Sequence, residues 1–154
     1  MNQDEPPMDT TLAPGAVRVG DELPPLHLPP VDRSALALFA GASGDHNPIH
    51  LDIDFAQRAG LPDVFAQGML GMAWLARLLT DWAPQSRLLD FKVRFLAITH
   101  VGDALSCSGR VLETFERDGM QCARLAVQAT DQDGERKIAG EALVALAHRP
   151  AGAP

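Results

Sequence analysis

The segment from Gly68 to Trp82 constrains the fold of this chain more than any other part of the sequence. It is apolar around almost its whole circumference, because Arg77 and Asp81 are its only charged residues. A helix of this kind has to be buried against other elements. Its most apolar part, Met69 to Leu79, is too short to cross a bilayer, which takes roughly 20 residues. The segment therefore predicts a long helix at the centre of a protein core and no membrane span.

The residues after this helix alternate between apolar and polar types, which is the pattern of half-buried strands. The apolar positions of the four expected strands are Leu89, Phe91, Val93 and Phe95; Leu105, Cys107, Gly109 and Val111; Ala123, Leu125, Val127 and Ala129; and Ile138, Gly140, Ala142, Val144 and Leu146. Asp118-Gly119 and Asp133-Gly134 predict hairpin turns between the later strands. Helices followed by an antiparallel meander indicate the α+β class, with the central helix packed on one curved sheet.

Two shorter helices are expected before the central one. Asp32 can cap the first, which Gly41 and Gly44 bring to an end, and Asp52 can cap the second, which Gly60 closes. The proline-rich segment 23–30 is expected to be extended, because each proline disfavours helix in the residue before it.

The length of 154 residues and the hydrophobic content of 46% fit one domain with a core of its own. We expect that domain to span residues 17–147. Residues 1–16 and 148–154 mix Pro, Gly and polar residues without periodicity, so we expect flexible tails there. The two cysteines, Cys107 and Cys122, lie in apolar-patterned segments without CxxC spacing, which favours buried thiols over a disulfide or a zinc site.

Charge and the N-terminal sequence narrow the classes of function. The formal net charge is -7 and the Lys and Arg residues are dispersed, so nucleic-acid binding is not expected. The first residues carry acids and prolines where a secretory signal needs basic residues and an apolar run. A cytoplasmic protein is therefore expected.

The loop between the two short helices carries an acid and an imidazole that could work together. Asp45 and His50 stand five positions apart around Pro48, which prevents a continuous helix there. On a bent loop the two side chains could hold one water molecule from two sides and activate it. The alternative is structural: Asp45 and Asn47 would turn the chain while His50 packs under the next helix.

A metal site is a second alternative for this loop, since it contains several oxygen and nitrogen donors. The donors are His46, His50, Asp52 and Asp54. Pro48 breaks the helical geometry that would bring both imidazoles to one face, and Asp52 is better used as a cap. No metal is expected.

The start of the central helix, Gln67-Gly68-Met69, is a candidate binding site. Helix N-termini present free N–H groups and partial positive charge, and a glycine lets a ligand carbonyl come close to the backbone. Gly68 could therefore help to form an oxyanion hole. The alternative is that Gly68 and Gly71 only allow close packing of the helix on the sheet.

These residues resemble those of the MaoC-like, or (R)-specific, enoyl-CoA hydratase family. The resemblance rests on Phe39-Ala40-x-x-Ser43-Gly44-Asp45-x-Asn47-Pro48-x-His50-x-Asp52, followed by Ala56, Gly60 and Gly68-Met69. It implies the hot-dog fold, an antiparallel sheet wrapped around a long central helix. It also implies a homodimer or higher oligomer, or a pairing with a different hot-dog subunit, with the site at or near the subunit interface.

The resemblance further implies the roles of individual residues. Asp45 and His50 would be the catalytic dyad, and the Gly68 amide would bind the thioester carbonyl. Asn47 would hold the loop in shape, and Asn47, Gln67 and Met69 are expected on the substrate-binding side.

The chain departs from the family at the central helix. Many relatives have His where this chain has Gln67, and some have a serine in the middle of the helix, where this chain offers Ala73 and Ala76. A looser similarity links 79–82 and the strand that follows to small subunits of hydratases that act on steroid side-chain acyl-CoAs.

The expected activity is that of a hydro-lyase that adds water to the 2,3 double bond of a 2-enoyl thioester, or removes it. The partner would be an acyl-CoA or acyl-carrier thioester, and no cofactor is needed. The alternatives are a non-catalytic acyl-thioester-binding subunit and an acyl-CoA thioesterase.

Overall fold

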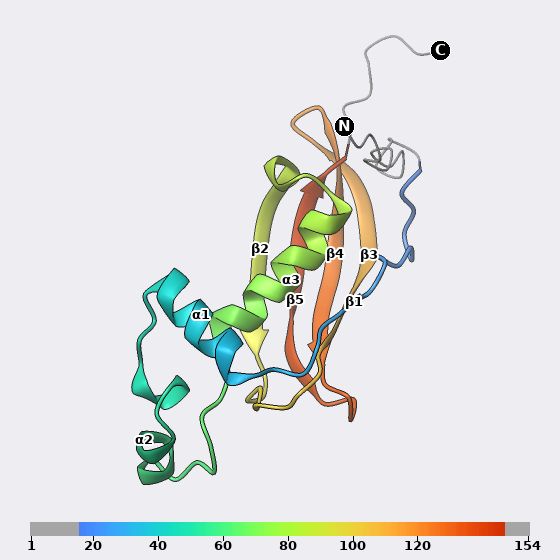
Figure 1. Cartoon of the computed structure of the whole chain (residues 1–154). Coiled ribbons are helices and arrows are strands. Elements are labelled where there is room, and N and C mark those ends of the chain that lie inside the picture. Colours follow the sequence, from blue (N-terminus) through green and yellow to red (C-terminus); the bar gives the residue numbers. More distant parts are fainter. Residues whose placement is uncertain (1–15, 147–154) are drawn as a thin grey trace, which may run out of the picture.

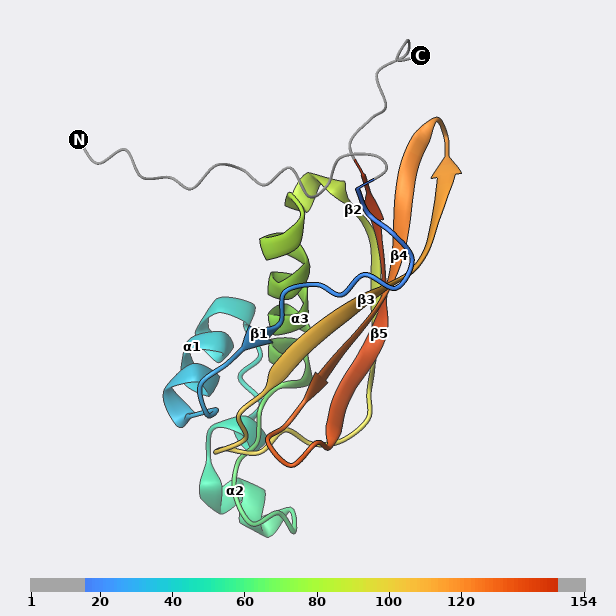
Figure 2. The same cartoon turned by 90° about the vertical axis from the view of Figure 1, so that its right-hand side faces the viewer.

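One antiparallel sheet of five strands curls around the long helix α3, as Figures 1 and 2 show. The structure is a computed structural model, and it describes residues 16–146. The helices are α1 (Arg33–Ser43), η2 (Pro48–His50), α2 (Ile53–Arg58), α3 (Gly68–Trp82) and η3 (Gln85–Arg87), where η marks a single 3-10 turn. The strands are β1 (Leu26–His27), β2 (Leu88–Phe95), β3 (Ser106–Arg117), β4 (Met120–Thr130) and β5 (Arg136–Ala145). The predicted α+β class is confirmed, whereas the predicted tails lie almost entirely outside the described residues.

The helices lie to one side of the sheet. Figure 2 shows α3 along one face, with α1 beside the half of α3 where that helix begins and α2 beyond that end. No helix of residues 16–146 lies on the opposite face. The sequence predicted α3 with its observed bounds.

The order of the strands differs from the predicted meander. It is β1-β3-β4-β5-β2, so β2 pairs with β5 at the far edge and not with β3, the next strand in the chain. Alternation identifies a strand but carries no information on its partner. The segment 96–105 carries the chain from β2 at one edge to β3 on the other side of the sheet.

A bulge near the start of β2 corrects the predicted face of Leu89. The register with β5 shifts between Leu88 and Asp90, so Leu88 packs on the core while Leu89 is 42% exposed. A bulge adds one residue to a strand and breaks the alternation locally. Phe91 and Val93 pack on the core as expected.

The predicted caps and turns form as the residue types require. Asp32 accepts a hydrogen bond from Ala35 N at the start of α1, and Gly44 ends that helix in the left-handed conformation at φ 76°. Gly41 lies inside α1 and does not end it. At the β3–β4 hairpin, Asp118 and Gly119 have φ values of 52° and 76°, which is the two-residue turn that favours Asp-Gly.

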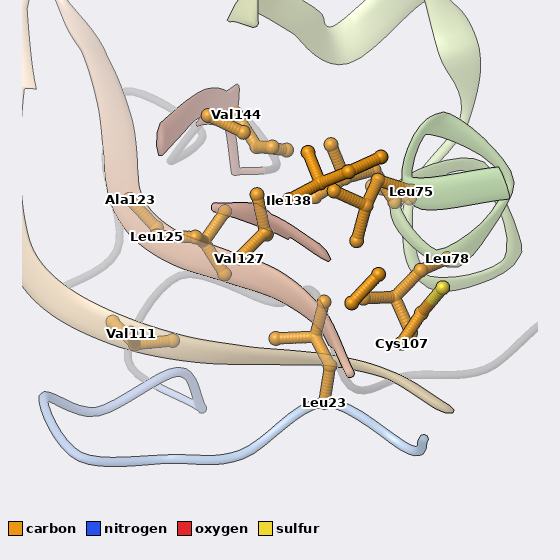
Figure 3. Close-up of a cluster of buried hydrophobic side chains, with 14 of the residues drawn as sticks. Leu23, Leu75, Leu78, Cys107, Val111, Ala123, Leu125, Val127, Ile138 and Val144 are labelled. Carbon is orange, nitrogen blue, oxygen red and sulfur yellow. The ribbon is translucent and has the colours of Figure 1, made fainter. Parts of the chain in front are cut away.

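The main core lies between α3 and the inner face of the sheet (Figure 3). Leu75 and Leu78 of α3 meet Leu125, Val127 and other apolar residues of the central strands. A second cluster packs α1 and α2 around the start of α3; its members are Val31, Leu36, Ala56, Val64, Ala66 and Leu70.

The prediction that α3 is buried on all sides was wrong for a single chain. Met69 is 55% exposed and Ala73 is also exposed, because one curved sheet covers only one side of the helix. Both cysteines are buried free thiols, as predicted, and burial raises the pKa of Cys107 to about 11. None of the helices in residues 16–146 has the length and apolar character needed to span a membrane.

Candidate active site

The loop between α1 and α2 is held in shape by its own polar residues. Asp45 Oδ1 accepts a hydrogen bond from Asn47 N at 3.3 Å, and Asn47 Oδ1 accepts one from Ile49 N at 3.1 Å. Pro48 then begins the turn η2, which ends at His50. The structural alternative is therefore true for Asp45 Oδ1 and Asn47 Oδ1, which turn the chain.

His50 is fixed in position and in tautomer. Its Nδ1 lies 2.8 Å from the carbonyl oxygen of Phe65, and its ring meets the Phe65 ring edge-on at 4.8 Å. A carbonyl oxygen only accepts hydrogen bonds, so Nδ1 must carry the proton. The Nε2 atom of the neutral ring is then left with a free lone pair.

The free atoms of the two residues face each other. His50 Nε2 lies 4.0 Å from Asp45 Oδ2, which is too long for a direct hydrogen bond. A single water oxygen about 2.8 Å from each atom fits this separation. His50 is only 9% exposed, whereas the Asp45 side chain is 42% exposed. The pair therefore joins a protected base to a carboxylate that solvent can reach.

The two glycines of α3 differ in what surrounds them. A side chain at Gly71 would collide with the Ile138 side chain, so this glycine serves packing of helix on sheet. Gly68 is exposed, and a Cβ there would lie 3.2 Å from the ring of Phe95. As the first residue of the helix, Gly68 has an N–H that no helical carbonyl can accept.

A cavity of about 320 Å³ opens beside Gly68. It is lined by Phe65, Ala66, Gln67, Gly68, Gly71, Phe95, Leu96, Ala97, Ile98, Thr99 and Ile138. Asp45 and His50 are not among its lining residues. Phe65 connects the two, because its carbonyl oxygen binds the His50 ring and the residue itself lines the cavity. The walls are mainly apolar, which suits a ligand with a hydrocarbon chain.

Gln67 is the most buried of the predicted site residues. It is 1% exposed, and its Nε2 donates to the carbonyl oxygen of Leu36 in α1 at 3.1 Å. Because a carbonyl oxygen only accepts hydrogen bonds, the amide nitrogen of Gln67 must face it, which fixes the orientation of the amide. Its Oε1 has no hydrogen-bond partner among residues 16–146. The side chain thus ties α1 to the start of α3, while Met69 beside Gly68 is mostly exposed.

Asp52 caps α2, as predicted, and is therefore occupied. Its Oδ1 accepts hydrogen bonds from Asp54 N and Phe55 N. His46 is exposed. In the described part of the chain, no three His, Cys, Asp or Glu side chains lie together in a way that could hold a metal ion.

Two residues of the site were not predicted from the sequence. Phe65 contributes a backbone carbonyl to His50, and a backbone atom leaves no signal in the residue pattern. Phe95 was assigned to the inner face of its strand, where it does lie, but it covers Gly68 and lines the cavity. The alternating pattern of the strand does not show whether an inward residue packs in the core or lines a cavity.

Comparison with known proteins identifies the family. Residues 15–133 match the model of the MaoC like domain. The chain is 32% identical to the (R)-specific enoyl-CoA hydratase of Aeromonas caviae over 113 residues, which cover 72% of this chain and 83% of that protein. It is 26% identical over 102 residues to the mitochondrial 3-hydroxyacyl-[acyl-carrier-protein] dehydratase FERN of Solanum lycopersicum, covering 66% of this chain and 62% of that protein.

A solved structure supports the same assignment. The unliganded R-hydratase PhaJ1 of Pseudomonas aeruginosa superposes with a TM-score of 0.78 at 26% identity, covering 93% of this chain and 94% of that one. The predicted hot-dog fold is confirmed by this likeness. The chain belongs to the family of MaoC-like domain proteins.

Proposed function

We propose that this protein adds water to the 2,3 double bond of a 2-enoyl thioester, or removes water in the reverse direction. The observation that carries the proposal is the pair formed by Asp45 Oδ2 and His50 Nε2, which lie 4.0 Å apart with the other ring nitrogen bonded to Phe65. The family includes hydratases and dehydratases, which supports hydro-lyase chemistry.

The tautomer of His50 supports a role for this residue in the first proton transfer. His50 Nε2 has the free lone pair, so it accepts one proton of the bound water while the water oxygen forms its bond to C3 of the substrate. Asp45 orients the water through its second hydrogen and stabilises the imidazolium that forms. The electrons of the double bond move to the thioester oxygen, and C2 then takes the proton back from His50 as the carbonyl re-forms. The step needs no other acid, base or cofactor.

The negative charge that develops on the thioester oxygen needs a hydrogen-bond donor to stabilise it. The Gly68 N–H has no helical acceptor and sits at the positive end of α3. It opens on the apolar cavity, where a preorganised donor changes a rate by roughly 100- to 1,000-fold. Gly68 therefore acts as the oxyanion donor, and Asn47, Gln67 and Met69 are proposed to shape the substrate-binding side around it.

The cavity and the relatives support an acyl thioester as the substrate class. The apolar lining between Phe95 and Ile98 takes the acyl chain. The Aeromonas caviae relative is named for enoyl-CoA and the tomato relative for acyl-carrier-protein thioesters, so the handle is CoA or a carrier arm. With CoA, the product of hydration is a 3-hydroxyacyl-CoA of the (R) series.

A second subunit is part of the proposal. The face of α3 that carries Met69 and Ala73 is uncovered, and β2 is an edge strand whose end, with Phe95 and Leu96, exposes large apolar side chains. Exposed edges and apolar patches of this kind are covered in stable proteins. We expect light scattering to give a mass at least twice that of one chain. A monomer that is fully active would contradict this part of the proposal.

Two alternatives remain from the sequence: a thioester-binding subunit without activity and a thioesterase. A thioesterase attacks the carbonyl carbon and releases free thiol, whereas a hydratase removes the conjugated enoyl group and releases none. A binding subunit does neither.

Product analysis separates the three. Purified protein is mixed with crotonyl-CoA or a longer 2-enoyl-CoA, and the enoyl absorbance and free thiol are followed together. We expect loss of absorbance without thiol. Thiol release at the rate of absorbance loss would establish a thioesterase, and no change with any chain length would leave the binding role.

A further inference from the structure

Lys137 is a charged residue in an unusual position. It lies on β5, and only 2% of its side chain is exposed. Its Nζ lies 3.1 Å from Asp131 Oδ2 and 3.4 Å from Asp103 Oδ2, and it also contacts Glu135. A buried ammonium group is costly unless it is paired, and here three carboxylates surround it.

Lys137 and Asp131 keep their charges in the folded protein. Burial lowers the pKa of Lys137, but hydrogen bonds and ion pairs with the three carboxylates outweigh it and hold the pKa above its usual range. Burial likewise raises the pKa of Asp131, but Lys137 and the backbone N–H groups of Glu135 and Asp133 outweigh it and keep that pKa low. Lys137 and Asp131 therefore stay ionised near neutral pH.

The same residue holds both ends of one wall of the cavity. Segment 96–103, here named the wall segment, contributes four of the residues that line the cavity. At one end, the Lys137 carbonyl oxygen accepts hydrogen bonds from Leu96 N at 2.8 Å and Ala97 N at 3.3 Å. At the other end, Asp103 Oδ2 accepts from His100 N at 2.8 Å and pairs with Lys137 Nζ.

The wall segment is in turn attached to the site. His100 forms a β-bridge with Phe65, and Ala66 N donates to Thr99 O at 2.9 Å. Phe65 is the residue that holds the His50 ring, and Gly68 follows two residues after Ala66. A connected series of contacts therefore runs from Lys137 through the wall segment to both the base and the oxyanion donor.

We propose that Lys137 is a positioning residue: it fixes the wall segment, and through it the width of the cavity that binds the acyl thioester. Its effect on substrate binding rests on the proposed function, whereas its effect on the position of the wall segment does not. Stability alone does not account for the cluster, because apolar side chains of similar volume often replace a whole buried ion pair without loss. The paired lysine instead fixes the position of the wall segment.

The first test measures the wall segment directly. Amide hydrogen exchange is compared between the wild type, Lys137→Met and the control Lys92→Met, which removes an exposed lysine of β2. In Lys137→Met we expect the exchange of the His100 amide to be accelerated roughly tenfold more than that of Leu125 in the central strand β4. Leu96 and Ala97 keep their main-chain acceptor at position 137 and should be accelerated less than His100. Lys92→Met should leave all four unchanged. Equal acceleration at Leu125 would mean a purely structural lysine and would overturn the proposal.

Asp103→Asn provides a second variant if Lys137→Met does not fold. Asparagine keeps an oxygen that can accept from His100 N but loses the charge that pairs with Lys137. Faster exchange at His100, with little change at Leu125, supports the proposal. Unchanged exchange at His100 would show that the ion pair does not position the wall and would also overturn it.

The second test addresses the substrate. For a 2-enoyl-CoA substrate, Lys137→Met should raise KM by roughly tenfold and change kcat by less than about threefold. The wall lines the acyl cavity, whereas the loop that carries Asp45 and His50 is also held by its own hydrogen bonds. Lys92→Met should match the wild type. An inactive wild type refutes the proposed function and leaves the exchange result standing, whereas an active wild type with equal KM in Lys137→Met refutes the positioning role alone.

Discussion

Among single residues, Gln67 combines one satisfied and one unsatisfied polar atom in a fully buried place. Its Nε2 donates to Leu36 O, and its Oε1 has no partner in the described part of the chain. A hydrogen bond contributes about 1 kcal/mol, and a buried unpaired acceptor costs about 1–3 kcal/mol. We therefore expect Gln67→Met to change the free energy of unfolding by no more than about 1 kcal/mol, measured by urea denaturation.

Gln67→Glu is the matched variant of nearly the same shape. It removes the amide donor to Leu36 O and places a carboxylate in a buried position, so we expect a loss of roughly 3 kcal/mol. If Gln67→Met cost more than about 2 kcal/mol, Oε1 would have to be hydrogen-bonded in solution, and the residue would have a larger role than the tie between α1 and α3.

Sequence reasoning at this scale identified residue types but not the use of their atoms. Asp45 and His50 were found because an acid and an imidazole flank a proline, and the structure brings them to 4.0 Å. The sequence pattern could not distinguish Asp45 Oδ1, which turns the chain, from Oδ2, which faces His50. Lys137 was missed because a lysine in an alternating strand is normally assigned to the solvent face. Its burial depends on carboxylates whose approach the strand pattern does not show, two from the preceding turn and one, Asp103, from a distant position.

Among the elements, the pairing of β2 with β5 depends on a glycine. A Cβ at Gly140 would collide with the backbone of Lys92 and Val93 in β2, which cannot move without opening the sheet edge. We expect Gly140→Ala to cost roughly 3 kcal/mol, the upper end of the range for overpacking, and to increase amide exchange in β2.

Gly71→Ala is the control for this prediction. Its Cβ would meet only the end of the Ile138 side chain, which can move, and alanine favours the helix. We expect a cost of about 1 kcal/mol or less. Equal costs for the two variants, measured by thermal or urea unfolding, would mean that β2 adapts as easily as a side chain and that the edge of the sheet is loosely held.

The elements were predictable where local chemistry determines them. The bounds of α3, the caps at Asp32 and Asp52 and the turn at Asp118-Gly119 all follow from residue types at short range. The partner of β2 was not predictable, because strand alternation is the same whichever strand lies beside it. The bulge that turns Leu89 outward was missed for a related reason, since it depends on the register with β5.

For the whole molecule, the buried cluster around Lys137 predicts how stability depends on pH. The pKa of Asp131 is lowered in the folded protein, so its carboxylate contributes stability above its ordinary unfolded pKa of about 3.9. That contribution is lost as the pH falls through the lower folded value. The difference in free energy of unfolding between wild type and Asp131→Asn should therefore be constant from pH 7 to about 5 and shrink below about pH 4.

Glu116→Gln, which removes an exposed carboxylate of β3, controls for the general effect of lost negative charge. It should show only a small difference from wild type across the same range. A difference for Asp131→Asn that stays the same from pH 7 to pH 2 would contradict the ionised cluster.

The molecule has a closed core on one side of α3 and accessible surfaces on the other. The sheet and one face of α3 form a closed core, whereas the other face of α3, the end of β2 and the Asp45 side chain remain accessible. The expected second subunit would cover these surfaces and complete the cavity. The sequence could predict the core from its periodicity, but not the uncovered face, because an all-round apolar helix looks the same whether its own sheet or a partner buries it.

The dyad dependence of enoyl-CoA hydration is the most direct test of the proposed function. The initial rate of absorbance loss is measured for wild type, Asp45→Asn and His50→Gln, with the neighbouring exposed residues as matched controls, Asp54→Asn and His46→Gln. We predict a rate at least about 100-fold lower in each dyad variant, with folding intact by circular dichroism, and near-normal rates in both controls. Near-normal hydration by a folded Asp45→Asn or His50→Gln variant would contradict the assignment.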